Sequence, residues 1–82
     1  MEKVLVYSTE TCQYCHMVKD YLKEKNVDFE EIDVGKDQEK GQEMVEKSGQ
    51  MGVPVLDIGG EIIVGFNKPK IEEVLKEKGL LK

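Results

Sequence analysis

The chain has 82 residues, of which 39% are hydrophobic and 35% charged, a balance typical of one small globular domain. We expect a single domain over residues 1–82 with a modest core. The net charge of −5 argues against a nucleic-acid partner, because phosphate binding needs a surface rich in Lys and Arg. No apolar run approaches the roughly 20 residues of a membrane span, and the four apolar residues that follow Met1-Glu2-Lys3 are too few for the hydrophobic region of a secretory signal. We therefore expect a cytoplasmic protein without membrane contact.

The first third of the chain predicts a strand, a polar loop and an amphipathic helix. The apolar run Val4–Tyr7 does not alternate, which is typical of a strand buried on both faces. Thr11 is suited to cap a helix that begins at Cys12. Lys25–Asn26 closes the helix, since Asn tolerates the left-handed conformation. The predicted buried face has apolar residues at helical spacing, namely Met17, Val18, Tyr21 and Leu22.

The middle of the chain predicts three more strands and a charged helix. Val27–Val34 alternates enough for a second strand, and the charged segment Asp37–Ser48 predicts a largely solvated helix. Val53–Ile58 and Glu61–Val64 then form the two strands of a hairpin. The turn between them is Gly59–Gly60, because two glycines allow the positive φ angles of a tight hairpin turn.

The last element is a helix over Pro69–Lys78, with Pro at a favoured first position and Asn67 or Lys68 as its cap. The predicted order is therefore β-α-β-α-β-β-α. The first βαβ unit makes the first two strands parallel with a right-handed crossover, and the hairpin makes the last two antiparallel. We predict an α/β domain with a mixed four-stranded sheet and helices on both of its faces.

The motif Cys12-Gln13-Tyr14-Cys15 contains both cysteines of the chain and lies between the first predicted strand and the first helix. A dithiol in that position is typical of a redox site. A thiolate is the nucleophile in disulfide exchange, and a helix N-terminus lowers the pKa of a cysteine from its usual value of about 8.5. We predict that Cys12 is the catalytic nucleophile and that Cys15, one turn further, is the resolving thiol.

Two other chemistries remain open for the same cysteines. Cys12-x-x-Cys15-His16 matches the attachment motif of c-type haem, although haem attachment accompanies export, which this N-terminus does not predict. A structural zinc site needs about four ligands. The two Cys and one His of the chain need a second subunit or carboxylates to complete it, so we expect no bound metal.

Four features together resemble the glutaredoxin-like members of the thioredoxin fold. They are the dithiol after the first strand, Val53-Pro54 before the third, the Gly59-Gly60 turn, and Val64-Gly65-Phe66 after the fourth. The resemblance covers the whole chain and implies a thioredoxin fold with dithiol redox activity. It also implies a cis Val53–Pro54 peptide that faces the dithiol and pairs with an extended substrate. The expected substrate-contact residues are Gln13, Tyr14, Val53, Pro54, Gly65 and Phe66.

Two departures from the family pattern concern the electron donor. Glutathione-binding members carry Lys or Arg where this chain has Thr9, and Asp where it has Asn67. The Gly65-Phe66 pair is instead similar to redoxins that accept electrons from thioredoxin reductase. We therefore predict a monomeric oxidoreductase without a bound prosthetic group. It reduces disulfide-containing proteins and receives electrons from NADPH through a flavoprotein of the thioredoxin-reductase type.

The alternative function is a glutathione-dependent glutaredoxin that removes glutathione from proteins. Some family members bridge an iron–sulfur cluster between two subunits with external glutathione, and the weak glutathione clamp disfavours that role here. Tyr14 is interpreted as an exposed partner contact, and His16 as an exposed helix residue with a modest effect on Cys12. Phe66 has two interpretations, as ordinary core or as a hydrophobic contact beside the dithiol.

Overall fold

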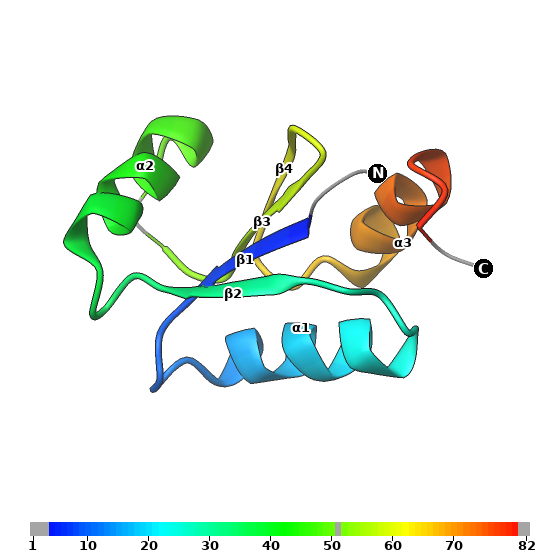
Figure 1. Cartoon of the computed structure of the whole chain (residues 1–82), viewed down its shortest axis with the longest axis horizontal. Coiled ribbons are helices and arrows are strands. Elements are labelled where there is room, and N and C mark those ends of the chain that lie inside the picture. Colours follow the sequence, from blue (N-terminus) through cyan, green and yellow to red (C-terminus); the bar gives the residue numbers. More distant parts are fainter. Residues whose placement is uncertain (1–3, 51, 81–82) are drawn as a thin grey trace.

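The computed structural model describes residues 4–50 and 52–80, and their elements follow the predicted β-α-β-α-β-β-α order (Figure 1). The strands are β1 (Val4–Ser8), β2 (Glu30–Asp33), β3 (Val55–Ile58) and β4 (Glu61–Val64). The helices are α1 (Gln13–Glu24), α2 (Gln38–Ser48) and α3 (Lys68–Glu77). The predicted α/β class is confirmed.

The strands form a four-stranded sheet in the order β2-β1-β3-β4. β1 pairs with β2 in parallel and β3 pairs with β4 antiparallel, as predicted. β3 also pairs antiparallel with β1, which the sequence did not predict. The hairpin turn has both central residues at positive φ, 57° for Gly59 and 98° for Gly60, the geometry of a primed turn. Asn26 also adopts the predicted left-handed conformation after α1, with φ of 58°.

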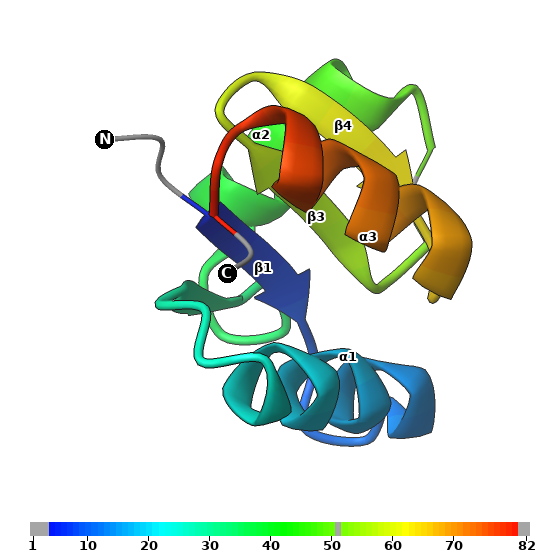
Figure 2. The ribbon, with the colours of Figure 1, turned by 90° about the vertical axis from the view of Figure 1, so that its right-hand side faces the viewer.

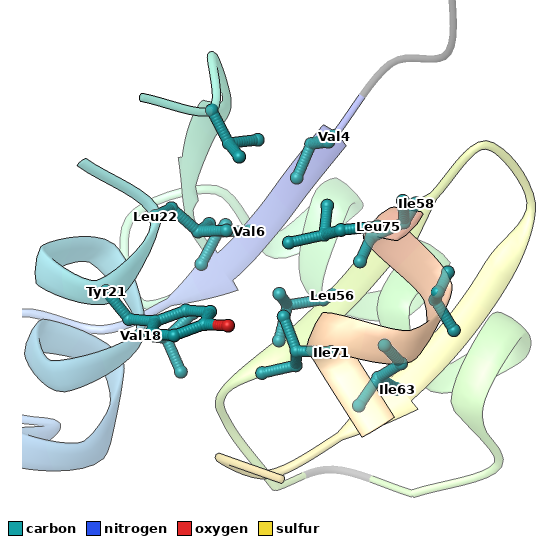
Figure 3. Packing of buried hydrophobic residues seen from close by; sticks show 12 residues of the cluster. Val4, Val6, Val18, Tyr21, Leu22, Leu56, Ile58, Ile63, Ile71 and Leu75 are labelled. Atoms are coloured by element: carbon teal, nitrogen blue, oxygen red, sulfur yellow. The ribbon is translucent and has the colours of Figure 1, made fainter. Parts of the chain in front are cut away.

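Helices cover both faces of the sheet. α1 and α3 share one face, while α2 lies on the opposite face, behind the sheet in the view of Figure 2. The main core, on the α1/α3 face, combines strand residues with the inward sides of both helices (Figure 3). Its buried members include Val6, Leu22, Leu56 and Leu75, all of them fully buried. A smaller cluster of Tyr7, Met44 and Val55 lies beneath α2.

The structure corrects three local predictions. Cys12 itself is the N-cap of α1, so neither the Thr11 cap nor a helical start at Cys12 is right. Met17 is 45% exposed, because the buried side of α1 is turned toward Cys15 instead. The second and third strands are shorter than predicted, since residues 27–29 and 53–54 lie outside the ladder.

Tyr21 carries an orphaned hydroxyl group in the main core. The residue is 5% exposed, and its phenolic oxygen has no hydrogen-bond partner among the described residues. Figure 3 shows the ring extending from α1 toward α3, with the oxygen at its far end. Burial, followed by the nearby charges of Glu72 and Glu24, raises the pKa of Tyr21, so the phenol stays neutral.

Replacing Tyr21 with Phe should stabilise the protein by about 1 kcal/mol, because an unsatisfied buried hydroxyl costs free energy that Phe does not. The measurement is chemical denaturation of the Tyr21→Phe protein. The matched control is Tyr14→Phe, whose ring is 64% exposed and whose hydroxyl removal should leave stability unchanged. A destabilised Tyr21→Phe protein would show that the hydroxyl has a partner after all.

A polar cluster fastens α1 to the edge strand β2. Lys19 donates to the Glu31 carboxylate at 2.6 Å, and the buried Ser8 hydroxyl donates to the same carboxylate at 3.2 Å. The hydrogen bond from Lys19 is the main reason that the pKa of Glu31 lies below its ordinary value. The cluster joins the strand that precedes the dithiol to the helix that follows it.

The lowered pKa of Glu31 makes part of the folding stability depend on pH. The carboxylate stabilises the fold fully above its unfolded pKa of about 4.3, and the contribution is lost as pH falls through the lower folded pKa. Glu31→Gln should therefore cost up to about 1 kcal/mol at pH 7, as expected for a half-exposed ion pair. Denaturation at pH 7 and pH 3 measures this, and an equal cost at both values would contradict it.

Candidate active site

The two cysteines lie at the N-terminus of α1 and are joined in a disulfide, with Cα atoms 5.2 Å apart. Cys12 is the helix N-cap, and its Sγ accepts the backbone N–H of Cys15 at 3.1 Å. Cys15 is fully buried, whereas Cys12 is half-buried. The arrangement leaves Cys12 as the sulfur that a partner reaches first, and gives it a backbone donor at the positive end of the helix.

The residues between the cysteines face solvent. Gln13 is exposed, and Tyr14 is 64% exposed, as expected for a surface that contacts a partner. His16 is exposed too, and its Nε2 lies 3.1 Å from the backbone oxygen of Glu10, which fastens the loop before the dithiol to the first turn of α1. A carbonyl oxygen only accepts, so this contact requires the proton on Nε2.

The peptide bond between Val53 and Pro54 is cis, as the resemblance implied. Pro54 is buried, and its carbonyl oxygen accepts the backbone N–H of Gly65 at 2.8 Å. Two predicted site residues from different loops are thus joined directly. Gly65 itself has φ of 80°, the left-handed region that favours glycine.

The strand register explains why the predicted site residues gather at one end of the sheet. Tyr7, near the end of β1, pairs with Val55 at the start of β3, and Val55 pairs with Val64 at the end of β4. The loop to the dithiol, the Val53–Pro54 segment and the Gly65–Phe66 turn therefore all meet the sheet at the same end of its strands. The site is assembled from three loops that are far apart in sequence.

Phe66 takes part in the main core, and its predicted contact beside the dithiol stays a prediction. Its partly buried ring packs against the main core and meets the Tyr21 ring edge-on, with centroids 6.2 Å apart. The ammonium groups of Lys68 and Lys25 lie over the same Tyr21 ring, at 5.4 and 5.8 Å from its centroid. Phe66 is thus a core contact at the rim of the site, and its position beside Gly65 is fixed by this packing.

Thr9 and Asn67, at the two positions where the family resemblance implies a charged contact with glutathione, have other contacts in this structure. Asn67 is the N-cap of α3, and its Oδ1 accepts the backbone N–H of Lys70 at 3.3 Å. Thr9 lies against the loop at Gly35, where the next residue, Lys36, pairs with Glu10 at 2.7 Å. Neither Thr9 nor Asn67 carries a charge, and Lys36, which follows Gly35 in the chain, is paired with the carboxylate of Glu10.

Sequence reasoning missed a polar network on the α2 face. The Lys47 ammonium donates to Asp57 at 2.8 Å and to the Tyr7 hydroxyl at 2.9 Å, and lies 3.2 Å from Glu43. The hydrogen bond that Lys47 donates to Asp57 is the main cause that raises the pKa of Lys47 above its ordinary value. The helical spacing of Glu43 and Lys47 was a visible signal, but the strand partners were not.

Within residues 4–50 and 52–80, no helix has the length and apolar character needed to cross a membrane. Over the same residues, no group of three or more His, Cys, Asp or Glu side chains is placed to hold a metal ion.

Comparison with known proteins places this geometry in a family. The family model described as Glutaredoxin matches residues 4–63. An uncharacterized glutaredoxin-like 8.6 kDa protein from the rubredoxin operon of Clostridium pasteurianum is 46% identical over 74 residues, covering 90% of this chain and 99% of that protein. The crystal structure of a glutaredoxin from Archaeoglobus fulgidus aligns with a TM-score of 0.85 and 31% identity, over 93% of this chain and 88% of that one.

A third relative is described as a glutaredoxin-like protein with a thioredoxin-like activity profile. It is NrdH-redoxin from Escherichia coli, which aligns with a TM-score of 0.77 and 27% identity over 87% of this chain and 92% of that one. The chain therefore belongs to the glutaredoxin family, with the thioredoxin fold, and is a thiol–disulfide oxidoreductase. Its Cys12–Cys15 pair is the redox-active centre.

Proposed function

We propose that the protein reduces disulfides in other proteins and is reduced in turn by a flavoprotein of the thioredoxin-reductase type, with NADPH as the electron source. We also propose that it works as a monomer in the cytoplasm, in electron transport and redox balance. The observation that carries the proposal is the Cys12–Cys15 disulfide at the start of α1, together with the uncharged residues Thr9 and Asn67 at the two positions where glutathione-binding family members carry a charge.

The reaction begins with the reduced protein. The Cys12 thiolate attacks one sulfur of the substrate disulfide, forms a mixed disulfide and releases the other substrate sulfur as a thiolate that takes up a proton. Cys15 then loses its proton and attacks the Cys12 sulfur, which releases the second substrate thiol. Two electrons pass to the substrate, and the protein is left with the Cys12–Cys15 disulfide seen in the structure.

The helix N-terminus supports these roles electrostatically. The backbone N–H of Cys15 points at the Cys12 sulfur, and the positive end of the α1 dipole favours a thiolate there. In the reduced protein both effects stabilise the thiolate form of Cys12 over the thiol. The buried Cys15 has no such access to solvent, which suits a thiol that attacks only within the mixed disulfide.

The substrate is proposed to bind in an extended conformation beside Val53 and Pro54. Gln13 and Tyr14 flank the nucleophile from α1, while Gly65 and Phe66 form the opposite rim. The bond from Gly65 to Pro54 holds the two rim segments together. Exposed Tyr14 offers an apolar contact that a polypeptide can cover, which a small thiol such as glutathione does not require.

We favour a reductase over glutathione as the reductant because the protein lacks charged side chains at two positions that would bind glutathione. A glutathione tripeptide presents two carboxylates and one ammonium group, and Thr9 and Asn67 offer none of the complementary charges. The thioredoxin-like activity profile stated for the E. coli NrdH-redoxin supports the same choice. Glutathione-dependent deglutathionylation is the second candidate, favoured by membership of the glutaredoxin family.

A coupled assay separates the two candidates. The oxidised protein is mixed with insulin as the disulfide substrate, and NADPH consumption is followed with either thioredoxin reductase or glutathione plus glutathione reductase. Turnover with thioredoxin reductase alone is the expected result. Turnover only with glutathione would contradict the proposed reductant and favour the second candidate, and turnover with neither would contradict the proposed reduction of protein disulfides.

A further inference from the structure

We infer that Lys47 is a positioning residue, which holds α2 against the sheet and thereby fixes the Val53–Pro54 segment that receives a polypeptide substrate. The inference rests on the proposed function, because it gives Lys47 a part in substrate binding at that same site. Lys47 acts through other residues and takes no direct part in the disulfide exchange.

The contacts of Lys47 join three elements at one ammonium group. It donates to Asp57 on β3 and to the Tyr7 hydroxyl on β1, and it pairs with Glu43 on its own helix. The same ammonium lies 5.4 Å from the centroid of the Tyr7 ring. Met44 is the buried residue of α2 and Val45 is partly buried beside it, so the Lys47 contacts add a polar link to a small apolar contact between this helix and the sheet.

Described contacts lie on both sides of the α2–β3 connection, at Ser48 and at Val53. The Ser48 hydroxyl donates to the Met44 carbonyl oxygen at 2.7 Å and accepts the backbone N–H of Gln50 at 3.3 Å. These two hydrogen bonds fix the end of α2. Val53, next to Pro54, packs against the small cluster to which Tyr7 and Met44 belong. A shift of α2 on the sheet therefore moves the residue whose backbone would pair with substrate.

The hydrogen bond from Gly65 to Pro54 provides a local reporter. The Gly65 N–H is held by the Pro54 carbonyl oxygen at 2.8 Å, so its exchange with solvent measures how well that segment stays in place. A loss of order near Val53 and Pro54 should speed this exchange even where the overall fold is intact. The readout requires neither a substrate nor a reductase.

The experiment compares Lys47→Met with Lys40→Met. Lys40 is a matched control, because it lies on the same helix and pairs with the same Glu43, at 3.4 Å, without joining α2 to the sheet. We expect Lys47→Met to raise KM for insulin about tenfold with kcat nearly unchanged, the size of effect that loss of a charge-assisted hydrogen bond produces. The rate with the small substrate bis(2-hydroxyethyl) disulfide should stay at the wild-type value.

Hydrogen exchange and a conservative variant complete the test. The Gly65 amide should exchange faster in Lys47→Met than in Lys40→Met, and Lys47→Arg, which keeps the charge and the donors, should restore most of the insulin KM. Where Lys47→Met does not fold, Tyr7→Phe removes one acceptor of the network and keeps the ring, and it should shift the same two readouts by less.

Two results would overturn the positioning role. One is an equal loss of rate with insulin and with the small disulfide, in proportion to the folded fraction, which would mark Lys47 as a stability residue only. The other is Gly65 exchange identical to that of Lys40→Met. A wild-type protein that does not reduce insulin would refute the proposed function, while the Gly65 comparison would still decide whether Lys47 orders the segment.

Discussion

Replacing Cys12 with Ser should abolish disulfide reduction, with turnover falling by more than about a thousandfold, because a serine hydroxyl is not ionised near neutral pH and forms no disulfide. Cys12 is the more accessible of the two sulfurs and carries the N–H contact expected of a stabilised thiolate. Insulin reduction, followed by NADPH consumption or by turbidity, measures the loss. Full activity of the Cys12→Ser protein would refute the assignment of the nucleophile.

The matched control for that experiment is Cys15→Ser. This variant keeps the nucleophile, so the first attack should proceed and the mixed disulfide should persist, because the resolving thiol is missing. Mass spectrometry under non-reducing conditions should find the substrate covalently attached to the Cys15→Ser protein. Attachment to Cys12→Ser instead would reverse the two roles.

Replacing Leu56 with Ala should destabilise the fold by about 3 kcal/mol, within the usual range for a large-to-small change in a packed core. Leu56 is fully buried in β3, a strand paired on both sides, and its side chain lies between α1 and α3 in the main core (Figure 3). In a small domain that loss is a large part of the total stability. Chemical denaturation with the disulfide intact measures it.

The matched control for Leu56 is Val64→Ala on the neighbouring strand β4. Val64 is 44% exposed, so its truncation removes little buried area and should cost less than about 1 kcal/mol. Equal costs for the two variants would mean that the space around Leu56 closes after truncation or that Val64 has a larger structural role than its exposure indicates.

Most of the fold was predictable because its signals are local. The unalternating run at β1, the glycine pair of the hairpin and the left-handed Asn26 each follow from the residues at that position. The cis bond before Pro54 and the gathering of three loops at one sheet edge required the family resemblance as well. The dithiol was the strongest signal, since its place between a strand and a helix is readable in the chain.

The predictions that failed depended on side-chain direction. A Thr before Cys12 is a good cap by composition, but the chain turns so that the Cys12 sulfur faces the free N–H groups. Met17 fits the helical period of the buried face, yet the angle at which α1 meets the sheet leaves it half exposed and buries Cys15. The Lys47 network was invisible because its partners Tyr7 and Asp57 come from strands distant in sequence.

The unequal clusters on the two faces of the sheet imply that the domain does not open uniformly. Among the residues that the structure describes, twelve buried hydrophobic residues form the main core with α1 and α3, whereas three form the cluster beneath α2. Local unfolding should therefore release α2 at a lower free energy than it releases the dithiol helix. A protease that cleaves such locally unfolded states would cut first between β2 and β3. The part of the molecule that carries the cysteines would be the last to unfold.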